Sequence, residues 1–213
     1  MSECSNNKKT LMFPKPTLER LKLYLALLLQ EEKEYISSDE IAKKLKITPE
    51  QVRKDISYLN FVGKPKVGYH IPSLLNELNE LFGVDVTDNV IVVGAGGLGT
   101  AIAKYKGFKR IGIDIVAIFD NDEDKIGTFV SELVVLPLSE LQRVIKRFKV
   151  KIAALCVPKE SAQEAADLLV KSGIKAIWNF APAILHVPPG ILVENEDITR
   201  GILSIKHMLE KNK

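Results

Sequence analysis

The sequence predicts an α/β protein with two domains, an N-terminal winged helix-turn-helix domain (1–84) and a C-terminal Rossmann-like domain with a parallel sheet (85–213). The first observation behind this prediction is a pair of short helical segments that are separated by three residues and followed by a glycine- and proline-rich turn. The second is an alternation of apolar strand-like runs and amphipathic helical runs from residue 89 onward. The length of 213 residues is also comfortable for two domains of ordinary size.

The composition is that of a soluble globular protein, with 46% hydrophobic and 27% charged residues. No apolar run approaches the roughly 20 residues of a membrane span, and the polar start lacks the apolar core of a signal peptide. The two cysteines, Cys4 and Cys156, form neither a disulfide framework nor a metal cluster. These features favour a cytoplasmic protein without a membrane segment and without a bound metal.

The helix-turn-helix is expected at about 17–59. Its first helix is indicated by leucines at steps of three and four residues: Leu18, Leu21, Leu25, Leu28 and Leu29. Ser37 and Glu40 form a capping box that starts a second, short helix. Thr48 precedes a proline at the start of a third helix, where Gln51 is expected to complete a second capping box. This third helix would bury Val52, Ile56 and Leu59.

A basic stretch accompanies the third helix and the turn that follows it. Between Lys43 and Lys66 there are seven Lys and Arg residues and two acids, which gives a local net charge of +5. Residues 60–70 predict a short hairpin, the wing, because glycines and a proline surround basic residues. Such a surface suits DNA phosphates, while the alternative is an ordinary solvated helix face. The exposed side of the third helix would present Glu50, Arg53, Lys54 and Ser57.

Residues 91–101 indicate a strand, a glycine-rich turn and the start of a helix. Gly94 would permit the tight turn, Gly96 would let the backbone approach a pyrophosphate, and Gly99 would let the helix pack close to the sheet. The motif alone is weak evidence, but here it follows a strand, and a second strand ends at Asp120 about 20 residues further on. We therefore predict a dinucleotide site, with a nucleotide fold kept only for structure as the alternative.

Asp120 is the expected partner of the adenosine ribose hydroxyls of that dinucleotide. Its charge would repel a 2′-phosphate, and the next residues, Asn121 and Asp122, offer no arginine to hold one. The sequence therefore favours NAD(H) over NADP(H) as the cofactor.

The chain offers binding sites but no catalytic machinery. A dehydrogenase needs a substrate pocket and a proton donor or acceptor near the hydride, and the 93 residues after Asp120 are taken up by the remaining sheet and helices. The histidines His70, His186 and His207 are expected to be solvated or structural. We predict that the protein is no enzyme and that cofactor occupancy of one domain governs the DNA affinity of the other.

Together these motifs resemble the Rex family of redox-sensing repressors over essentially the whole chain. The most specific match is the string Gln51–Tyr58 in the third helix, and the loop Gly94–Gly99 is a second match. Further matches are 63–64, 67–69, 105–108, 119–120, 179–182 and 193–195 with Asp197. The resemblance implies a homodimer in which the C-terminal helix, at about 197–211, is swapped between the Rossmann domains. It also implies that NADH releases the dimer from operator DNA, expected to be palindromic, whereas NAD⁺ permits repression.

The residues of both sites follow from the motifs and the resemblance. The predicted cofactor residues are Gly94, Ala95, Gly96, Gly97, Leu98, Gly99, Tyr105, Asp120, Val157, Pro158, Asn179, Phe180, Ala181, Asp197 and Ile198. The predicted DNA-binding residues are Thr48, Gln51, Arg53, Lys54, Ser57, Tyr58, Lys64, Lys66 and Tyr69. Arg53 and Lys54 would enter the major groove, and Lys64, Lys66 and Tyr69 would lie near the wing, phosphates and the minor groove.

Several positions depart from the family pattern. Family members often carry an arginine at the position of Ala26, and Lys-Arg-Gly where this chain has Lys64-Pro65-Lys66. Gly97 replaces a common polar or basic residue, and Ile198 replaces a larger apolar side chain. Two other functions stay open from the sequence: a DNA-binding regulator that senses another nucleotide or a CoA-type ligand, and an oxidoreductase with a DNA-binding appendage.

Overall fold

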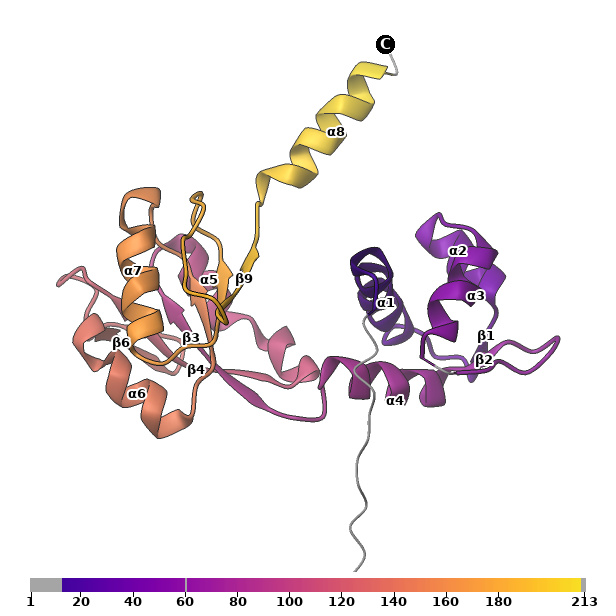
Figure 1. The fold of residues 1–213 in the computed structure, drawn as a ribbon, viewed down its shortest axis with the longest axis horizontal. Coiled ribbons are helices and arrows are strands. Elements are labelled where there is room, and N and C mark those ends of the chain that lie inside the picture. The colour runs from indigo at the N-terminus through magenta and orange to yellow at the C-terminus, as the bar shows by residue number, and fades with distance from the viewer. Residues whose placement is uncertain (1–12, 60, 212–213) are drawn as a thin grey trace, which may run out of the picture. The chain divides into compact units, whose positions relative to one another are not determined.

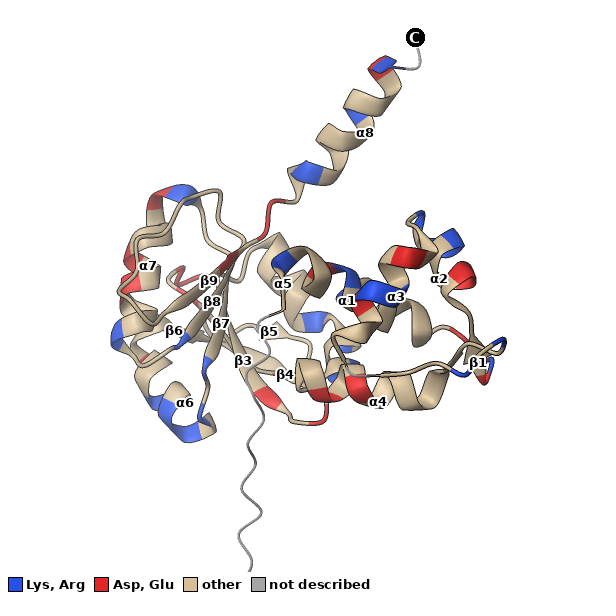
Figure 2. Cartoon of the chain, turned by 45° about the vertical axis from the view of Figure 1, so that its right-hand side comes forward, with Lys and Arg blue, Asp and Glu red and all other residues tan. Residues whose placement is uncertain are grey.

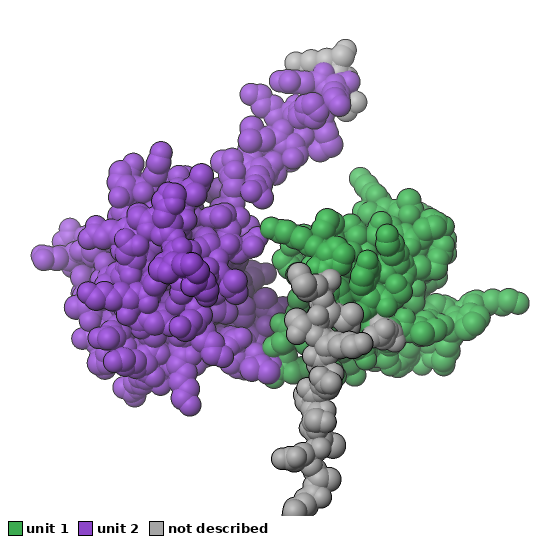
Figure 3. Space-filling model, viewed as in Figure 1, with its two compact units in different colours: residues 1–85 green, residues 86–213 purple. Residues whose placement is uncertain are grey.

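The computed structural model describes residues 13–59 and 61–211. The chain divides into two compact units, Met1–Asp85 and Val86–Lys213 (Figure 3). Within the described ranges, no helix has the length and hydropathy of a membrane span. Cys4 lies outside the described residues.

The described part of the first unit consists of four helices and a small sheet (Figure 1). The helices are α1 (Lys15–Leu28), α2 (Ser38–Leu45), α3 (Pro49–Ser57) and α4 (Ile71–Phe82). The sheet pairs β1 (Tyr35–Ile36) with β2 (Tyr69–His70) in antiparallel orientation. Three residues separate α2 from α3, as the helix-turn-helix prediction requires.

One hydrophobic core joins the inner faces of these helices. The predicted apolar side of the third helix is confirmed, because Val52, Ile56 and Leu59 are all buried. Leu29 was wrongly predicted to be part of the apolar stripe of α1: the helix ends one residue earlier, and the Leu29 side chain is 52% exposed. A tyrosine, Tyr24, is fully buried in this stripe instead.

The two predicted capping boxes differ in outcome. The first is confirmed, because the hydroxyl of Ser37 accepts a hydrogen bond from the backbone N–H of Glu40, and the Glu40 carboxylate accepts one from the N–H of Ser37. The second is wrong in part. Thr48 does cap α3 by accepting from the N–H of Gln51, but the Gln51 side chain donates to the carboxylate of Asp55 at 2.9 Å. A capping box needs the Gln51 side-chain oxygen to accept from the N–H of Thr48, but the Gln51 amide is turned toward Asp55, one helical turn further along α3.

The predicted wing is a short hairpin turn between α3 and α4. The N–H of Lys64 donates to the carbonyl of Gly68 at 2.8 Å, and the N–H of Gly68 donates back at 3.0 Å. Lys66 has a φ of +64° at the tip of this turn. The partner strand β1 was not predicted, because two residues are too short to show an alternating pattern.

The second unit is built on a seven-stranded sheet. In spatial order the strands are β5 (Phe129–Val130), β6 (Leu133–Pro137), β4 (Ile113–Asp120), β3 (Asp88–Val93), β7 (Ile152–Leu155), β8 (Ala176–Asn179) and β9 (Leu192–Asn195). All neighbours are parallel except β5 and β6. From β6 to β9 this is the strand order of a Rossmann fold, which confirms the predicted fold class.

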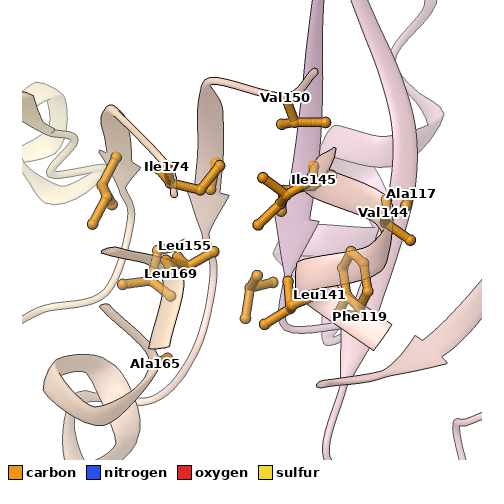
Figure 4. Close-up of a cluster of buried hydrophobic side chains, with 14 of the residues drawn as sticks. Ala117, Phe119, Leu141, Val144, Ile145, Val150, Leu155, Ala165, Leu169 and Ile174 are labelled. Atoms are coloured by element: carbon orange, nitrogen blue, oxygen red, sulfur yellow. The ribbon is translucent and has the colours of Figure 1, made fainter. Parts of the chain in front are cut away.

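Helices cover both faces of this sheet. Val92 of β3 packs in one cluster with Ile102 of α5 (Gly97–Lys104), whereas its neighbours Ile91 and Val93 pack on the opposite face. That opposite face is covered by α6 (Leu141–Phe148) and α7 (Lys159–Lys171). Figure 4 shows Leu141, Val144 and Ile145 of α6 lying against the β4 residues Ala117 and Phe119. The burial of both faces explains the continuous apolar runs in the sequence.

The last element is α8 (Thr199–Lys211). Every residue of α8 is exposed in the single chain. Two short 3₁₀ segments, Lys106–Ile111 and Leu138–Glu140, complete the described part of this unit.

Candidate functional site

A glycine loop joins β3 to α5 at the carboxyl edge of the sheet. Gly94 has a φ of +102°, and a Cβ atom there would lie 2.4 Å from the carbonyl oxygen of Cys156. A Cβ atom on Gly99 would lie 1.8 Å from the carbonyl oxygen of Gly94. Gly96 and Gly97 have no atom within 4 Å of that position. Two glycines are thus needed to form the loop, and the other two leave its outer side open to a ligand.

A cleft of about 650 Å³ lies over this loop. Most of the residues that line it belong to the carboxyl ends of β3, β4 and β7, to the loops that follow these strands, and to the start of α5, which is where a Rossmann fold binds its dinucleotide. The helix α7 and the 3₁₀ segment Leu138–Glu140 contribute the rest. The predicted residues in its lining are Gly94, Gly96, Gly97, Leu98, Asp120, Val157 and Pro158. Residues that the sequence prediction missed are Val93, Asn121, Asp122, Lys125, Leu138, Cys156, Ser161, Glu164, Ala165 and Leu168.

Asp120 is held firmly at the floor of the cleft, where it is 7% exposed. Its carboxylate accepts hydrogen bonds from the backbone N–H groups of Ala95 at 2.7 Å and Asp122 at 2.9 Å. The Nζ atom of Lys125 lies 3.3 Å from the same carboxylate. Burial alone would raise the pKa of Asp120, but these hydrogen bonds outweigh it and hold the pKa below its ordinary value. Asp120 is therefore an anion at neutral pH, as an acceptor of ribose hydroxyls must be.

Cys156 lines the cleft and is partly exposed. Burial raises the pKa of its thiol to about 12. The thiol is therefore neutral near pH 7 and acts as an apolar wall.

The other predicted cofactor residues do not line this cleft. Asn179 is 1% exposed, and its side chain is used inside the protein: it donates to the carbonyl of Ala183 and to Asn195 and accepts from the N–H of Ala181. Asp197 accepts from the hydroxyl and N–H of Thr199. Tyr105, Phe180 and Ile198 are not among the residues that line the cleft, and Tyr105 is 62% and Ile198 76% exposed. Cofactor contacts of these residues stay predictions.

A groove lies on the first unit, between the start of α2, the helix α3 and the hairpin turn. It measures about 450 Å³ and is lined by Ser37, Ser38, Asp39, Arg53, Gly63, Lys64, Lys66, Val67, Gly68 and Tyr69. Figure 2 marks Lys and Arg along α2, α3 and the hairpin. Three of the predicted DNA-binding cations, Arg53, Lys64 and Lys66, thus border one groove. Their combined charge suits a phosphate backbone.

Arg53 is exposed on the outer side of α3. Its guanidinium donates to the hydroxyl of Ser38 at 2.9 Å and pairs with Glu50 at 2.8 Å. Glu50 is exposed and Ser38 is only partly buried, so that little free energy is lost when the arginine turns to another acceptor. Lys64 is held in a similar way, because its Nζ donates to the Tyr35 hydroxyl at 2.7 Å.

The remaining predicted DNA-binding residues fall into three groups: two exposed residues of α3, two residues that cap and brace this helix, and two tyrosines. Lys54 and Ser57 are exposed on the same helix, although the Ser57 hydroxyl donates to the carbonyl of Lys54. Thr48 and Gln51 make the hydrogen bonds that cap and brace α3. Tyr69 is 8% exposed in the core, and Tyr58 lies beside the ring of Phe13. DNA contacts of all these residues stay predictions.

A buried ion pair, which the sequence pattern did not reveal, holds α3 against α1. The Asp55 carboxylate is fully buried and accepts two hydrogen bonds from the guanidinium of Arg20, at 2.6 and 2.7 Å. It also accepts from the Tyr24 hydroxyl at 2.7 Å and from Gln51. Burial would raise the pKa of Asp55, but these donors keep it below its ordinary value.

Within the described residues, no group of three or more His, Cys, Asp and Glu is placed to hold a metal ion.

Comparison with known proteins supports both units. Residues 85–183 match the protein-family model described as "CoA binding domain", and residues 13–57 match the one described as "Putative DNA-binding protein N-terminus". The "Redox-sensing transcriptional repressor Rex 2" of Thermotoga maritima is 49% identical over 198 residues, which is 93% of this chain and 97% of the relative. The Rex protein of Treponema denticola is 43% identical over 201 residues, which is 93% of this chain and 96% of the relative.

Solved structures of RSP, a Rex-family repressor, have the same fold. RSP in complex with NAD⁺ and operator DNA matches with a TM-score of 0.86 and 34% identity, covering 94% of each chain. RSP in complex with NADH matches with a TM-score of 0.83 and 36% identity, covering 94% of this chain and 96% of RSP. With these identities over nearly the whole chain, the protein belongs to the Rex family of redox-sensing transcriptional repressors.

Proposed function

We propose that this protein represses transcription by binding operator DNA through its first unit, and that NADH in the cleft of its second unit releases it. The observation that carries the proposal is the open glycine loop beside the ionised Asp120, in a chain that also presents a basic groove at a helix-turn-helix. Structures of RSP with NAD⁺ and operator DNA, and with NADH, support the same pair of ligands.

The cofactor can act as a switch only if it binds better to the form that does not bind DNA. A coupling of about 1–3 kcal/mol changes operator affinity roughly 5- to 150-fold. We therefore expect NADH to lower the affinity for operator DNA by a factor in this range, and NAD⁺ to leave it nearly unchanged. A mobility-shift titration of the purified protein with each cofactor measures both effects.

Arg53→Ala provides a matched variant for this assay, because it alters the DNA groove and leaves the cleft untouched. It should weaken operator binding by about 1–3 kcal/mol if the side chain reads a guanine, with NADH affinity unchanged. Lys22→Ala, an exposed change on α1, is the control and should have no effect on either. Equal operator affinity with NADH and NAD⁺ would contradict the proposed sensing, and sustained turnover of NADH with a simple acceptor would contradict a purely regulatory role.

A second candidate ligand is CoA, because the family model that matches residues 85–183 is described by CoA binding. The buried carboxylate of Asp120 favours NAD(H), since it suits ribose hydroxyls and repels a phosphate at that position. Calorimetric titration with NADH and with CoA separates the two ligands. CoA binding that excludes NADH would favour the second candidate.

We also propose that the protein acts as a homodimer through α8. The helix exposes Ile202, Ile205, Met208 and Leu209. At 100° per residue, Ile202, Ile205 and Leu209 lie within about 60° of one another, so that they form one apolar side. An isolated helix with such a side gains by burying it against a protein surface, and a second copy of this chain is the partner that the family resemblance implies.

Ile205→Glu should weaken this dimer. Each buried isoleucine contributes roughly 1.5–3 kcal/mol, and a symmetric dimer loses two, so we expect the dissociation constant to rise at least about tenfold. Sedimentation velocity over a concentration series measures the change. His207→Glu, on the opposite side of the same helix, should sediment as the unmodified protein does. A monomeric unmodified protein, or an unchanged mass for Ile205→Glu, would contradict the proposed role of α8.

A further inference from the structure

Lys125 places a positive charge inside the cleft, where the sequence analysis considered only Asp120, Asn121 and Asp122. Its Nζ lies 3.3 Å from the Asp120 carboxylate and 3.1 Å from that of Asp122. The backbone that carries it is fixed, because the N–H of Lys125 donates to the carbonyl of Asp122 and its carbonyl accepts from the N–H and hydroxyl of Thr128. The side chain is partly exposed and lines the cleft. Only the side chain can therefore turn toward a ligand.

The donors around Asp120 are those that proteins use to hold a phosphate. They are two backbone N–H groups, from Ala95 and Asp122, and the ammonium of Lys125. Backbone N–H groups in turns and lysine side chains are common ligands of phosphate oxygens. The carboxylate of Asp120 thus occupies the position of an anion in a site that the rest of the protein builds.

We infer that Ala95, Asp122 and Lys125 form an anion site that the Asp120 carboxylate fills, and that the site binds the 2′-phosphate of NADP(H) once this carboxylate is removed. The inference rests on the proposed function, in which the cleft holds NAD(H). In Rossmann sites the adenosine ribose lies beside the acid at this position, so a 2′-phosphate would enter the space that the carboxylate leaves. Asp120 then excludes NADP(H) in two ways: it repels the phosphate, and it keeps Lys125 engaged.

The simpler explanation is repulsion by Asp120 alone. In that case Asp120→Ala would admit NADPH whether or not Lys125 is present. If the anion site exists, Asp120→Ala frees two N–H groups and Lys125, and the gain in NADPH affinity depends on the lysine. The side chain of Asp122 still holds Lys125 near the site in this variant.

The test compares NADPH and NADH affinities of the full-length protein and of three variants: D120A, D120A/K125M and D120A/K175M. Binding is followed by calorimetry or by the fluorescence of Trp178, the only tryptophan of the chain. For D120A we expect the ratio of NADPH to NADH affinity to rise about tenfold or more, as charge-assisted hydrogen bonds to the phosphate predict. Most of this gain should disappear in D120A/K125M.

D120A/K175M is the matched control. Lys175 directly precedes β8 at the amino edge of the sheet, away from the cleft, and its removal changes the net charge by the same amount. It should keep the gain of D120A. If D120A does not fold, D120S, whose hydroxyl can accept from the N–H of Ala95, replaces it throughout the series.

The outcomes separate the inference from the proposed function. An equal gain in D120A and D120A/K125M, or no gain in either, overturns the anion site while unmodified protein still binds NADH. Failure of the unmodified protein to bind NADH overturns the proposed function itself. A gain that disappears equally with K125M and K175M shows a general effect of charge and overturns the specific role of Lys125.

Discussion

Gly99→Ala should abolish NADH binding and destabilise the second unit by about 3 kcal/mol. The new Cβ atom would lie 1.8 Å from the carbonyl oxygen of Gly94, and a backbone oxygen cannot move aside as a flexible side chain can. The start of α5 would have to move away from β3, which separates the N–H groups of the loop from the pyrophosphate. Calorimetric NADH titration and thermal unfolding followed by Trp178 fluorescence measure the two effects, because the only tryptophan lies in β8 of this unit.

Gly97→Ala is the matched control for this prediction. It makes the same chemical change in the first turn of the same helix, but no atom lies within 4 Å of the new Cβ position. Its unfolding temperature should therefore equal or slightly exceed that of the unmodified protein, since alanine favours a helix over glycine. Equal stability of Gly99→Ala and Gly97→Ala would show that close packing between α5 and the loop is not required.

The glycine loop could be predicted from the sequence because its requirements are local. A side chain on Gly94 would clash with Cys156, directly after the adjacent strand, and one on Gly99 would clash with Gly94, five residues earlier. These requirements appear in the sequence as the spacing of the glycines. The end of β4 at Asp120 was predicted for the same reason, since a buried strand appears as a continuous apolar run.

The parts that the sequence did not predict depend on contacts between distant segments or on short irregular elements. Asp55 and Arg20 lie 35 residues apart in the chain, on two different helices, and no periodic pattern marks their pairing. Lys125 reaches Asp120 only because the turn after β4 folds back over the cleft. The strand pair β5 and β6 and the edge strand β9 are two to five residues long and partly exposed, so their hydrophobic pattern is weak.

Arg20→Met should unfold the first unit at a much lower temperature than the unmodified protein, with a loss of about 3–5 kcal/mol. The variant leaves the fully buried carboxylate of Asp55 without the two hydrogen bonds and the positive charge that compensate its burial. Tyr24→Phe is the graded comparison, because it removes one hydrogen bond to the same carboxylate and should cost about 1.5–3 kcal/mol. Far-ultraviolet circular dichroism reports the loss of helix in the first unit, while the Trp178 transition of the second unit should stay unchanged.

The stability difference between Arg20→Met and the unmodified protein should depend on pH, because both proteins bury the ionisable carboxyl of Asp55. In the unmodified protein the folded pKa of Asp55 lies below its ordinary value, so the stabilisation is complete above the ordinary aspartate pKa of about 3.9 and is lost as the pH falls through the lowered value. In Arg20→Met the burial of the Asp55 carboxylate is no longer offset by the arginine and raises its pKa. Acid therefore protonates this buried carboxylate, which removes the unpaired charge and restores part of the lost stability. The difference in unfolding temperature between the two proteins should therefore shrink as the pH falls from 7 toward about 4. A constant difference would mean that Arg20 stabilises α1 and α3 by packing of its aliphatic stem and not by its charge.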